Sequence, residues 1–533
     1  MRFTPQLPRL FALALLATCS AETVQAGETM DELSAVDPPP IWQAPIFSPG
    51  PAPDTIALQG TRGAAGFDPQ LAYVPKTERP EAGGREPLPF RADILADATP
   101  RPFGRGERVE IVAGDRMTIA CTKGDFPAGA VFSFAGRFPQ EAAFEIVVDG
   151  HLETVGLALV RKGGDASRPA DLIGSYDPSS NRIFVPAGVA TGDAELVLLC
   201  PTGGTHVEIA SLTLEPRRVA RDATHGAWIW DAAGWLDCPD ALLEKLRAAG
   251  LDEIYLQLPL GDSTTFDPWT DFLRHFRDAG VRIVAVEGDP AMVLDHGRRN
   301  AVLRATRLAA FRREHPGLIA GVQYDVEPYL LAAHAADPET SWRAWAELIV
   351  ELRGIFDAPV SVVVPFWMMG DPTARTALTK AVAHVDDLVV MAYRTDFGAI
   401  EDISAPWLEF AASESIGVRI ALENGPLPIE HHRIYRRAQA GEVALLAGPI
   451  STVELHPGPV HESPGRKVYA FSHEVVTDPL RTTFDGDLAG LAAARTRLTE
   501  TLSAWPYFRG LAFHGLIALS ESTSHGGCDA RDR

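Results

Sequence analysis

Carboxylate side chains recur at the ends of short apolar stretches in the second half of the chain. One stretch ends in Gln323-Tyr324-Asp325-Val326-Glu327, another ends in Glu423, and a third ends in Glu287 followed closely by Asp289. A carboxylate at the end of a buried strand is costly to desolvate unless it is paired or used. This clustering is the strongest functional signal in the sequence, and it predicts acid–base chemistry.

The stretch that ends at Glu327 is the most informative of these. Side chains alternate across a strand, so Gln323, Asp325 and Glu327 share one face. On an interior face, Asp325 would lie beneath Glu327 and raise its pKa through like-charge coupling. A carboxylic acid that stays protonated near neutral pH is what protonation of a glycosidic oxygen requires. The spacing therefore predicts Glu327 as an acid/base, with Asp325 beside it.

Strands and helices that alternate after residue 221 would position these side chains. The eight predicted strands are Ala227–Trp230, Glu253–Leu258, Arg282–Glu287, Ile319–Glu327, Val360–Phe366, Leu388–Tyr393, Arg419–Glu423 and Leu511–Leu516. Amphipathic segments between them include Pro239–Ala249, Trp269–Ala279, Trp342–Phe356 and Leu488–Leu502. Eight such units in residues 222–520 predict a (β/α)8 TIM barrel, whose chemistry lies at the carboxyl ends of its strands. A doubly wound sheet is the rival architecture, but no G-x-G-x-x-G or Walker sequence occurs.

The connection from about 424 to 487 is long enough to be an insertion in the barrel, and we expect it over the barrel mouth. Ahead of the barrel, alternating runs with Gly and Asp turns predict a β-sandwich over 105–217. Residues 27–104 are rich in Pro and Gly and predict an extended linker or wrapping arm without a fold of its own. Residues 521–533 form a C-terminal tail.

The N-terminus predicts export. Arg2 and Arg9 precede the apolar run Leu10–Ala17, and the triplet Val24-Gln25-Ala26 resembles a signal-peptidase site, so residues 1–26 read as a signal peptide. Lipidation at Cys19 is the alternative. We expect a periplasmic or extracellular protein with no transmembrane segment.

Export permits disulfides, and four cysteines follow the signal. Cys121 and Cys200 both lie in strand-like stretches of the predicted sandwich, so we pair them, although four cysteines allow three connectivities. Their spacing does not suit zinc. The formal charge of −22 disfavours nucleic-acid partners and favours neutral or cationic ligands.

Two short motifs resemble those of family 18 chitinase-like glycosidases. Gly321–Glu327 is similar to the end of their strand-four D-x-D-x-E motif, and Met391-Ala392-Tyr393 is similar to their strand-six M-x-Y-D. The resemblance implies Glu327 as acid/base, with Asp325 and Tyr393 orienting a substrate acetamide that acts as nucleophile. The chain departs from the pattern at Ala320, Gln323 and Arg394, where the family has aspartates.

A second template places an acid/base Glu after strand four and a nucleophile Glu after strand seven, which are Glu327 and Glu423 here. The two templates leave open whether Glu423 attacks or binds sugar hydroxyls. Further predicted substrate-binding residues are Glu287, Asp289, Gln323, Trp367, Arg394, Trp230 and His514. Packing is the competing interpretation for the aromatic side chains and for His514.

No metal or cofactor is expected, and Glu430-His431-His432 is interpreted as a solvated loop segment. The sequence thus predicts an exported glycoside hydrolase that acts on an oligo- or polysaccharide with retention. The alternative is a non-catalytic glycan-binding or cell-envelope assembly protein, and a lyase or isomerase on the same fold is a third hypothesis.

Overall fold

The computed structural model describes residues 39–517, apart from 47–52, 64–65, 74–84, 105–107, 115, 153–154, 165, 167, 169, 190, 221–222, 261–266, 332, 335–336 and 449–450. The predicted signal peptide, the Cys19 alternative and the tail at 521–533 lie outside the described residues. The chain divides into two compact units, one of which holds residues 80–327, 343–426 and 482–533.

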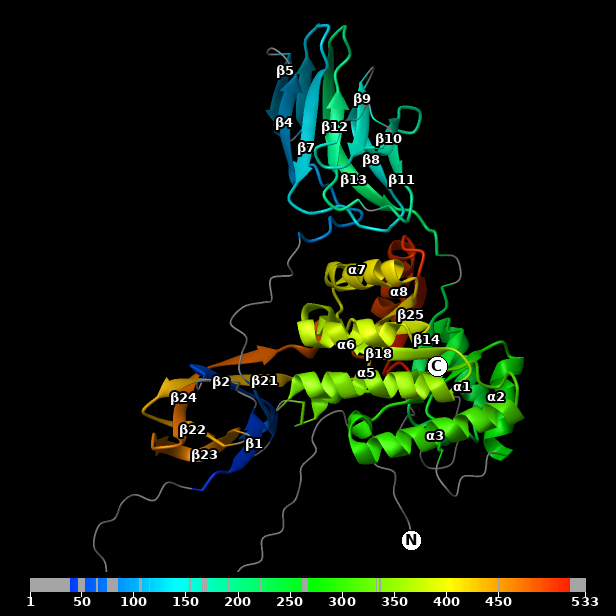
Figure 1. The fold of residues 1–533 in the computed structure, drawn as a ribbon, viewed down its shortest axis with the longest axis vertical. Helices are drawn as coiled ribbons and strands as arrows, with labels where there is room; N and C mark the ends of the chain where they lie inside the picture. The colour runs from blue at the N-terminus through cyan, green and yellow to red at the C-terminus, as the bar shows by residue number, and fades with distance from the viewer. Residues whose placement is uncertain are drawn as a thin grey trace, which may run out of the picture. The chain divides into compact units, whose positions relative to one another are not determined.

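This larger unit contains a closed barrel of eight parallel strands (Figure 1). The strands are β14 (Gly226–Ile229), β15 (Glu253–Leu256), β16 (Arg282–Glu287), β17 (Gly321–Tyr324), β18 (Val360–Pro365), β19 (Asp387–Met391), β20 (Gly417–Glu423) and β25 (Phe508–His514). Each predicted strand overlaps one of them, so the predicted (β/α)8 barrel is confirmed. Because the strands are covered on their outer side by helices, they are buried along nearly their whole length.

Helices alternate with the strands and lie outside them (Figure 1). They are α1 (Pro239–Ala249), α2 (Asp267–Asp278), α3 (Asp295–Glu314), α5 (Pro338–Ile355), α6 (Pro372–Val382), α7 (Phe397–Glu414) and α8 (Leu488–Leu502). At the amino ends of the strands, the ion pair between Arg419 and Glu253 fills the barrel, with side chains 6% and 1% exposed. The opposite, carboxyl ends carry the half-buried polar residues that form the candidate site.

A ten-stranded antiparallel sheet precedes the barrel in the same unit. It consists of β4 (Ala98–Gly104), β5 (Val109–Ala113), β6 (Met117–Cys121), β7 (Ala128–Phe134), β8 (Phe144–His151), β9 (Gly156–Val160), β10 (Leu172–Asp177), β11 (Arg182–Val185), β12 (Glu195–Leu199) and β13 (Thr205–Pro216). Its first strand begins inside the segment expected to be a linker. The antiparallel pairing agrees with the alternating pattern of the sequence, and the sandwich arrangement itself stays a prediction.

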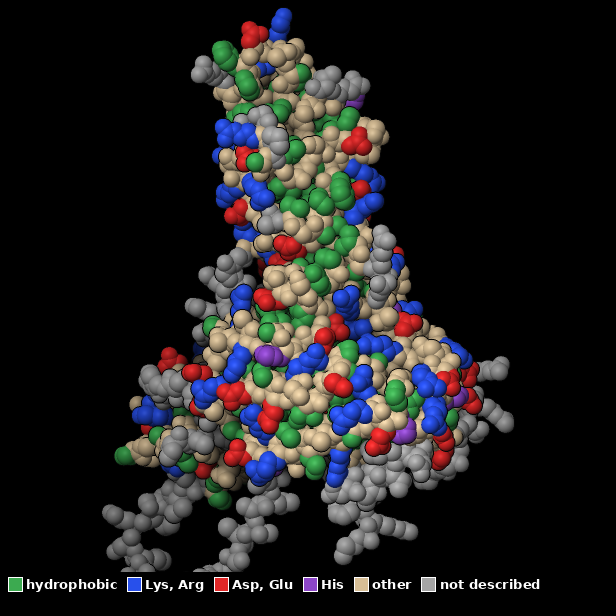
Figure 2. Space-filling view, turned by 45° about the vertical axis from the view of Figure 1, so that its right-hand side comes forward, with side chains coloured by type: hydrophobic (Ala, Val, Ile, Leu, Met, Phe, Trp, Pro, Cys, Tyr) green, Lys and Arg blue, Asp and Glu red, His purple; other side chains and the backbone are tan. Residues whose placement is uncertain are grey.

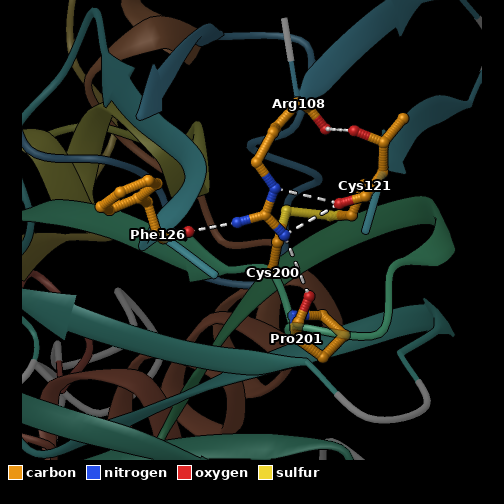
Figure 3. The surroundings of a disulfide bond; sticks show 6 residues. Arg108, Cys121, Phe126, Cys200 and Pro201 are labelled. Atoms are coloured by element: carbon orange, nitrogen blue, oxygen red, sulfur yellow. Dashed lines mark hydrogen bonds between the residues drawn. A yellow bond between two sulfur atoms is a disulfide. The ribbon is translucent and has the colours of Figure 1, made fainter. Parts of the chain in front are cut away.

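The predicted disulfide between Cys121 and Cys200 is present (Figure 3). It joins the end of β6 to the residue after β12, and these strands are not neighbours in the sheet, so the sheet bends back on itself. The buried guanidinium of Arg108 lies beside the disulfide and donates to the carbonyl oxygens of Thr122, Phe126 and Pro201. These bonds satisfy a buried cation with backbone acceptors.

The other unit contains a seven-stranded antiparallel sheet in the order β1-β23-β22-β24-β21-β2-β3. Its strands are β1 (Trp42–Ile46), β2 (Thr55–Gly63), β3 (Gly66–Tyr73), β21 (Glu430–Ala438), β22 (Ala440–Leu446), β23 (Ser451–His461) and β24 (Arg466–Thr477). Trp42–Ile46, Thr55–Gly63 and Gly66–Tyr73 are therefore strands, which corrects the expectation of an arm without a fold. β2 and β3 pair with each other locally, but β1 and β2 also pair with β23 and β21 of the predicted insertion, several hundred residues later, so the sequence around them did not indicate these partners.

Acidic and basic side chains are interspersed over the face drawn in Figure 2. Within the part of the chain that the structure describes, no helix is long and apolar enough to cross a membrane.

Candidate active site

Side-chain alternation carries polar residues into the barrel at the carboxyl ends of the strands. The apolar interior of the barrel includes Trp228, Val389, Ala421 and Ala512. Positions two residues further along a strand face the same way. Ala421 is thus followed on the interior face by Glu423, Ala512 by His514, and Val389 by Met391 and then Tyr393. We call Asp325, Glu327, Tyr393, Glu423 and His514 the mouth cluster.

Asp325 and Glu327 follow directly after β17, which ends three residues before the predicted limit. The Asp325 N–H still donates to the Glu287 carbonyl at 2.8 Å, so strand-like pairing continues as far as the first carboxylate. The side chain of Asp325 is half-buried, but its Oδ1 is fully buried and has no hydrogen-bond partner among the described residues. An unpaired buried carboxylate oxygen is expensive, so this group favours its neutral form.

The pKa of Asp325 is raised to about 8. Burial is the largest cause, the negative charge of Glu327 adds to it, and the positive charge of His514 opposes it. Because the charge of each carboxyl group affects the pKa of the other, the retained proton is shared by the two groups. With the pKa of Asp325 raised, the Asp325–Glu327 pair retains a proton near neutral pH. The spacing predicted a raised pKa for Glu327, and that assignment stays a prediction.

Glu423 and His514 form a second pair, at the ends of β20 and β25. Glu423 Oε2 lies 2.7 Å from His514 Nδ1, and Glu423 Oε1 accepts from the Gly425 N–H at 2.6 Å. Burial lowers the pKa of His514, but the hydrogen bond that His514 donates to Glu423 and the charges of Glu423, Asp325 and Glu327 raise it above its ordinary value overall. The imidazole thus favours the charged form next to the carboxyl pair.

Tyr393 links the two pairs. Its ring lies 6.3 Å from the His514 ring, with 29° between the two planes. Burial, and then the charges of Glu423, Asp325 and Glu327, raise the pKa of Tyr393 well above its ordinary value. The hydroxyl therefore stays protonated and available as a donor among three carboxyl groups.

Gln323 forms the floor beneath the mouth cluster. Its Oε1 accepts from Trp228 Nε1 at 2.6 Å, while its Nε2 is buried without a partner in the described part of the chain. The predicted shared face of Gln323, Asp325 and Glu327 is consistent with these contacts. Asn424 was not predicted, yet it is buried beside Glu423 with an unpaired Oδ1 among the described residues.

Two glycines allow the ends of β20 and β25 to approach each other. Gly515 has a φ of 65°, and a Cβ there would lie 2.3 Å from the Gly425 nitrogen. A Cβ at Gly425 would lie 3.0 Å from Glu423 Oε1. The motifs Glu423-Asn424-Gly425 and His514-Gly515 were the available signal for this close approach.

Glu287 and Asp289 lie apart from the mouth cluster. Val284 and Val286 face the barrel interior, so Glu287 faces outward, where Arg304 of α3 donates to both of its oxygens, at 2.5 and 2.9 Å. Asp289 accepts from the Ala291 N–H at 2.8 Å. Both acids line a separate cavity of about 250 Å3 beside α3. Their predicted role in substrate binding stays a prediction.

The remaining predicted residues surround the mouth. The Trp230 ring lies 6.4 Å from the His514 ring, and Trp367 is 38% exposed after β18. Arg394 donates to the Tyr393 carbonyl at 2.7 Å, and its guanidinium lies 4.8 Å from the centre of the Phe366 ring. Within the described residues, no group of three His, Cys, Asp or Glu side chains is arranged to hold a metal ion.

No family model matches this sequence, and no curated protein matches it. Solved structures to which the chain is similar include the spore cortex-lytic enzyme SleL of Bacillus cereus, at 10% identity and a TM-score of 0.32 over 67% of this chain and 94% of that one. A GH18 chitinase from Pseudoalteromonas aurantia has 12% identity and a TM-score of 0.28, over 38% and 81%. A putative deoxyribose-phosphate aldolase from Toxoplasma gondii has 13% identity and a TM-score of 0.26, over 39% and 78%. Scores this low do not decide between chemistries.

Proposed function

We propose that this protein is a glycoside hydrolase that acts on an oligo- or polysaccharide with retention of configuration. The observation that carries the proposal is the Asp325–Glu327 pair, which lies at the carboxyl ends of the barrel strands with the pKa of Asp325 raised to about 8. A carboxyl pair that retains one proton near neutrality is suited to protonating a leaving-group oxygen. The location agrees with where barrels of this kind carry out chemistry.

In this proposal, Glu327 gives its proton to the glycosidic oxygen as the bond between that oxygen and the anomeric carbon breaks. A nucleophile on the opposite face forms a bond to the anomeric carbon and holds the first intermediate. Water then attacks the same carbon, the bond to the nucleophile breaks, and the water gives a proton to Glu327, which restores the enzyme. Tyr393 donates to the substrate beside the reacting carbon, and Asp325 shares the proton of Glu327.

Export belongs to the same proposal. A disulfide such as Cys121–Cys200 forms in oxidising compartments, and the N-terminal sequence has the pattern of a signal peptide.

We also propose that the ten-stranded sheet is a β-sandwich that packs against the barrel. It contacts α7 through Arg137, whose guanidinium donates to both oxygens of Glu409 at 2.6 and 2.7 Å.

One observation favours a non-catalytic, glycan-binding function instead. Gln323 occupies a position at which the chitinase-like pattern has an aspartate, and its Oε1 is engaged by Trp228. A barrel with this floor could bind a sugar between Trp230 and Tyr393 without cleaving it.

The test is reducing-end release from a panel of bacterial and host glycans, measured for the wild type and Glu327→Gln side by side. We expect release by the wild type that the variant loses. Equal release by both would refute the assignment of Glu327. Retained glycan binding without release by either protein would favour the non-catalytic function.

A further inference from the structure

Both oxygens of Glu423 are already engaged by hydrogen bonds, and its side chain is almost fully buried. Oε1 accepts from the Gly425 N–H at 2.6 Å, and Oε2 is bound to His514 Nδ1 at 2.7 Å. The side chain is only 4% exposed. A carboxylate nucleophile must present an oxygen to the anomeric carbon, so Glu423 is placed to hold its neighbours and not to attack.

His514 presents its other nitrogen to the mouth. The bond between Glu423 and Nδ1 fixes the orientation of the ring, so Nε2 points away from Glu423. Nε2 has no partner within the described part of the chain, it is not among the fully buried unpaired atoms, and 19% of the side chain is exposed. It is therefore open to a molecule in the mouth.

Three aromatic rings keep the imidazole in place. The rings of Trp228, Trp230 and Tyr393 lie 6.0, 6.4 and 6.3 Å from it; the two tryptophans come from β14 and the residue after it, and Tyr393 follows β19. This packing leaves the ring little rotational freedom, so less conformational entropy is lost when Nε2 binds a ligand.

The groups that can bring a charge to the imidazole are all carboxyl groups, and Asp325 favours its neutral form near neutral pH because its pKa is raised to about 8. Glu423 contacts it directly, and Asp325 and Glu327 act on it from the end of β17. Tyr393, the other titratable neighbour, stays neutral because burial and the same carboxylates raise its pKa. The surroundings thus favour an imidazolium, which has a donor on Nε2 and no acceptor.

We propose that His514 is a further catalytic residue, an imidazolium whose Nε2–H donates to a substrate oxygen in the barrel mouth, and that Glu423 positions it. This inference rests on the proposed glycosidase function and selects among its mechanisms. The nucleophile is then a group of the substrate, because both oxygens of Glu423 are engaged and direct attack by water would invert the configuration. The substrate class is a sugar with an oxygen acceptor, such as a carbonyl or hydroxyl, adjacent to the reacting carbon.

The first experiment needs no substrate. The imidazole nitrogens of 15N-histidine-labelled full-length protein are followed by NMR against pH in the wild type and Glu423→Gln, and His514→Gln identifies the His514 signals. We expect the wild-type His514 to titrate above the ordinary histidine range, and Glu423→Gln to lower its pKa. Glu474→Gln is the matched control, because Glu474 Oε1 contacts His431 Nδ1 at 2.8 Å in the other unit. An unshifted His514, or one insensitive to Glu423→Gln, would overturn the proposal.

The second experiment uses the glycan that the wild type cleaves. We expect His514→Gln to lower kcat/KM by about 10²-fold or more. Glu423→Gln should move the alkaline limb of the pH profile to lower pH, whereas Glu474→Gln should leave the profile unchanged. Glu423→Gly is then assayed with azide, which restores turnover and forms a glycosyl azide if Glu423 is the nucleophile. Such rescue would overturn the positioning role. Absence of release by the wild type would instead refute the proposed function, and with it the catalytic role of His514.

Discussion

Replacement of Asp325 by Asn tests the buried carboxyl pair without any knowledge of the substrate. In the folded protein the pKa of Asp325 is about 8, against an ordinary value of 3.8. Between these two values the unfolded chain has released the proton that the folded protein still holds. The free energy of unfolding should therefore fall as pH rises through this window, by up to about 1.4 kcal/mol per pH unit. Below pH 4 both states are protonated, and above pH 8 both are ionised.

At pH 7 the free energy of unfolding should be roughly 4 kcal/mol lower than at pH 4, because pH 7 lies about three units above the ordinary pKa of an aspartic acid. Asparagine has nearly the shape of a protonated aspartic acid and does not titrate. Asp325→Asn should match the wild type in stability at pH 4 and exceed it by a few kcal/mol at pH 7. Catalytic groups held in destabilising surroundings commonly show such a gain when they are replaced.

The assay is urea unfolding followed by circular dichroism at half-unit steps from pH 4 to pH 8. Asp271→Asn is the control, since the side chain of Asp271 on α2 is 83% exposed. We expect the stability difference between Asp325→Asn and the wild type to grow with pH, and that of the control to stay flat. A difference for Asp325→Asn that does not depend on pH would refute the reasoning about the pair.

Three further outcomes follow from the geometry. Replacing Cys121 and Cys200 together by Ala opens a loop with a sequence separation of 79 residues. The free energy of unfolding, measured in urea, should fall by about 4 to 5 kcal/mol. A decrease below about 1 kcal/mol would show that the loop does not constrain the unfolded chain. Arg137→Ala leaves the half-buried carboxylate of Glu409 without its cation and with the Gln140 N–H as its remaining donor among the described residues, and should lower the free energy of unfolding by about 2 kcal/mol, whereas an unchanged midpoint would argue against the contact. Tyr393→Phe should reduce kcat/KM on the cleaved glycan by about 10-fold or more without changing the thermal midpoint, and full activity would remove the hydroxyl from the proposal.

The barrel could be predicted because its determinants are local. Each strand is a short apolar run followed by an amphipathic helix, and this pattern repeats from β14 to β25. The seven-stranded sheet could not be predicted in the same way. Thr55 pairs with Arg436 and Trp42 pairs with Leu455, so, apart from the local pairing of β2 with β3, the partners of this Pro- and Gly-rich segment lie far away in the sequence.

The mouth cluster was predicted as far as alternation along single strands allowed. The shared face of Asp325 and Glu327 follows from their spacing of two residues. The outward position of Glu287 depends on which face of β16 is interior, and an all-apolar strand does not reveal this. The hydrogen bond between Glu423 and His514 joins β20 and β25, which are consecutive barrel strands, but their pairing register across the long insertion required the three-dimensional structure.

The most direct test of the central claim asks how strongly the loss of activity caused by Glu327→Gln depends on the leaving group of the substrate. The loss in kcat/KM relative to the wild type is measured for the natural glycan and for an aryl glycoside of the same sugar with an acidic nitrophenol, with Glu244→Gln on the exposed face of α1 as the control. If Glu327 donates the proton, the loss should be about 10² to 10⁴ on the glycan and far smaller on the aryl glycoside, because a good leaving group needs no proton. Equal losses on both substrates, or none on either, would contradict the assignment of Glu327 as the acid.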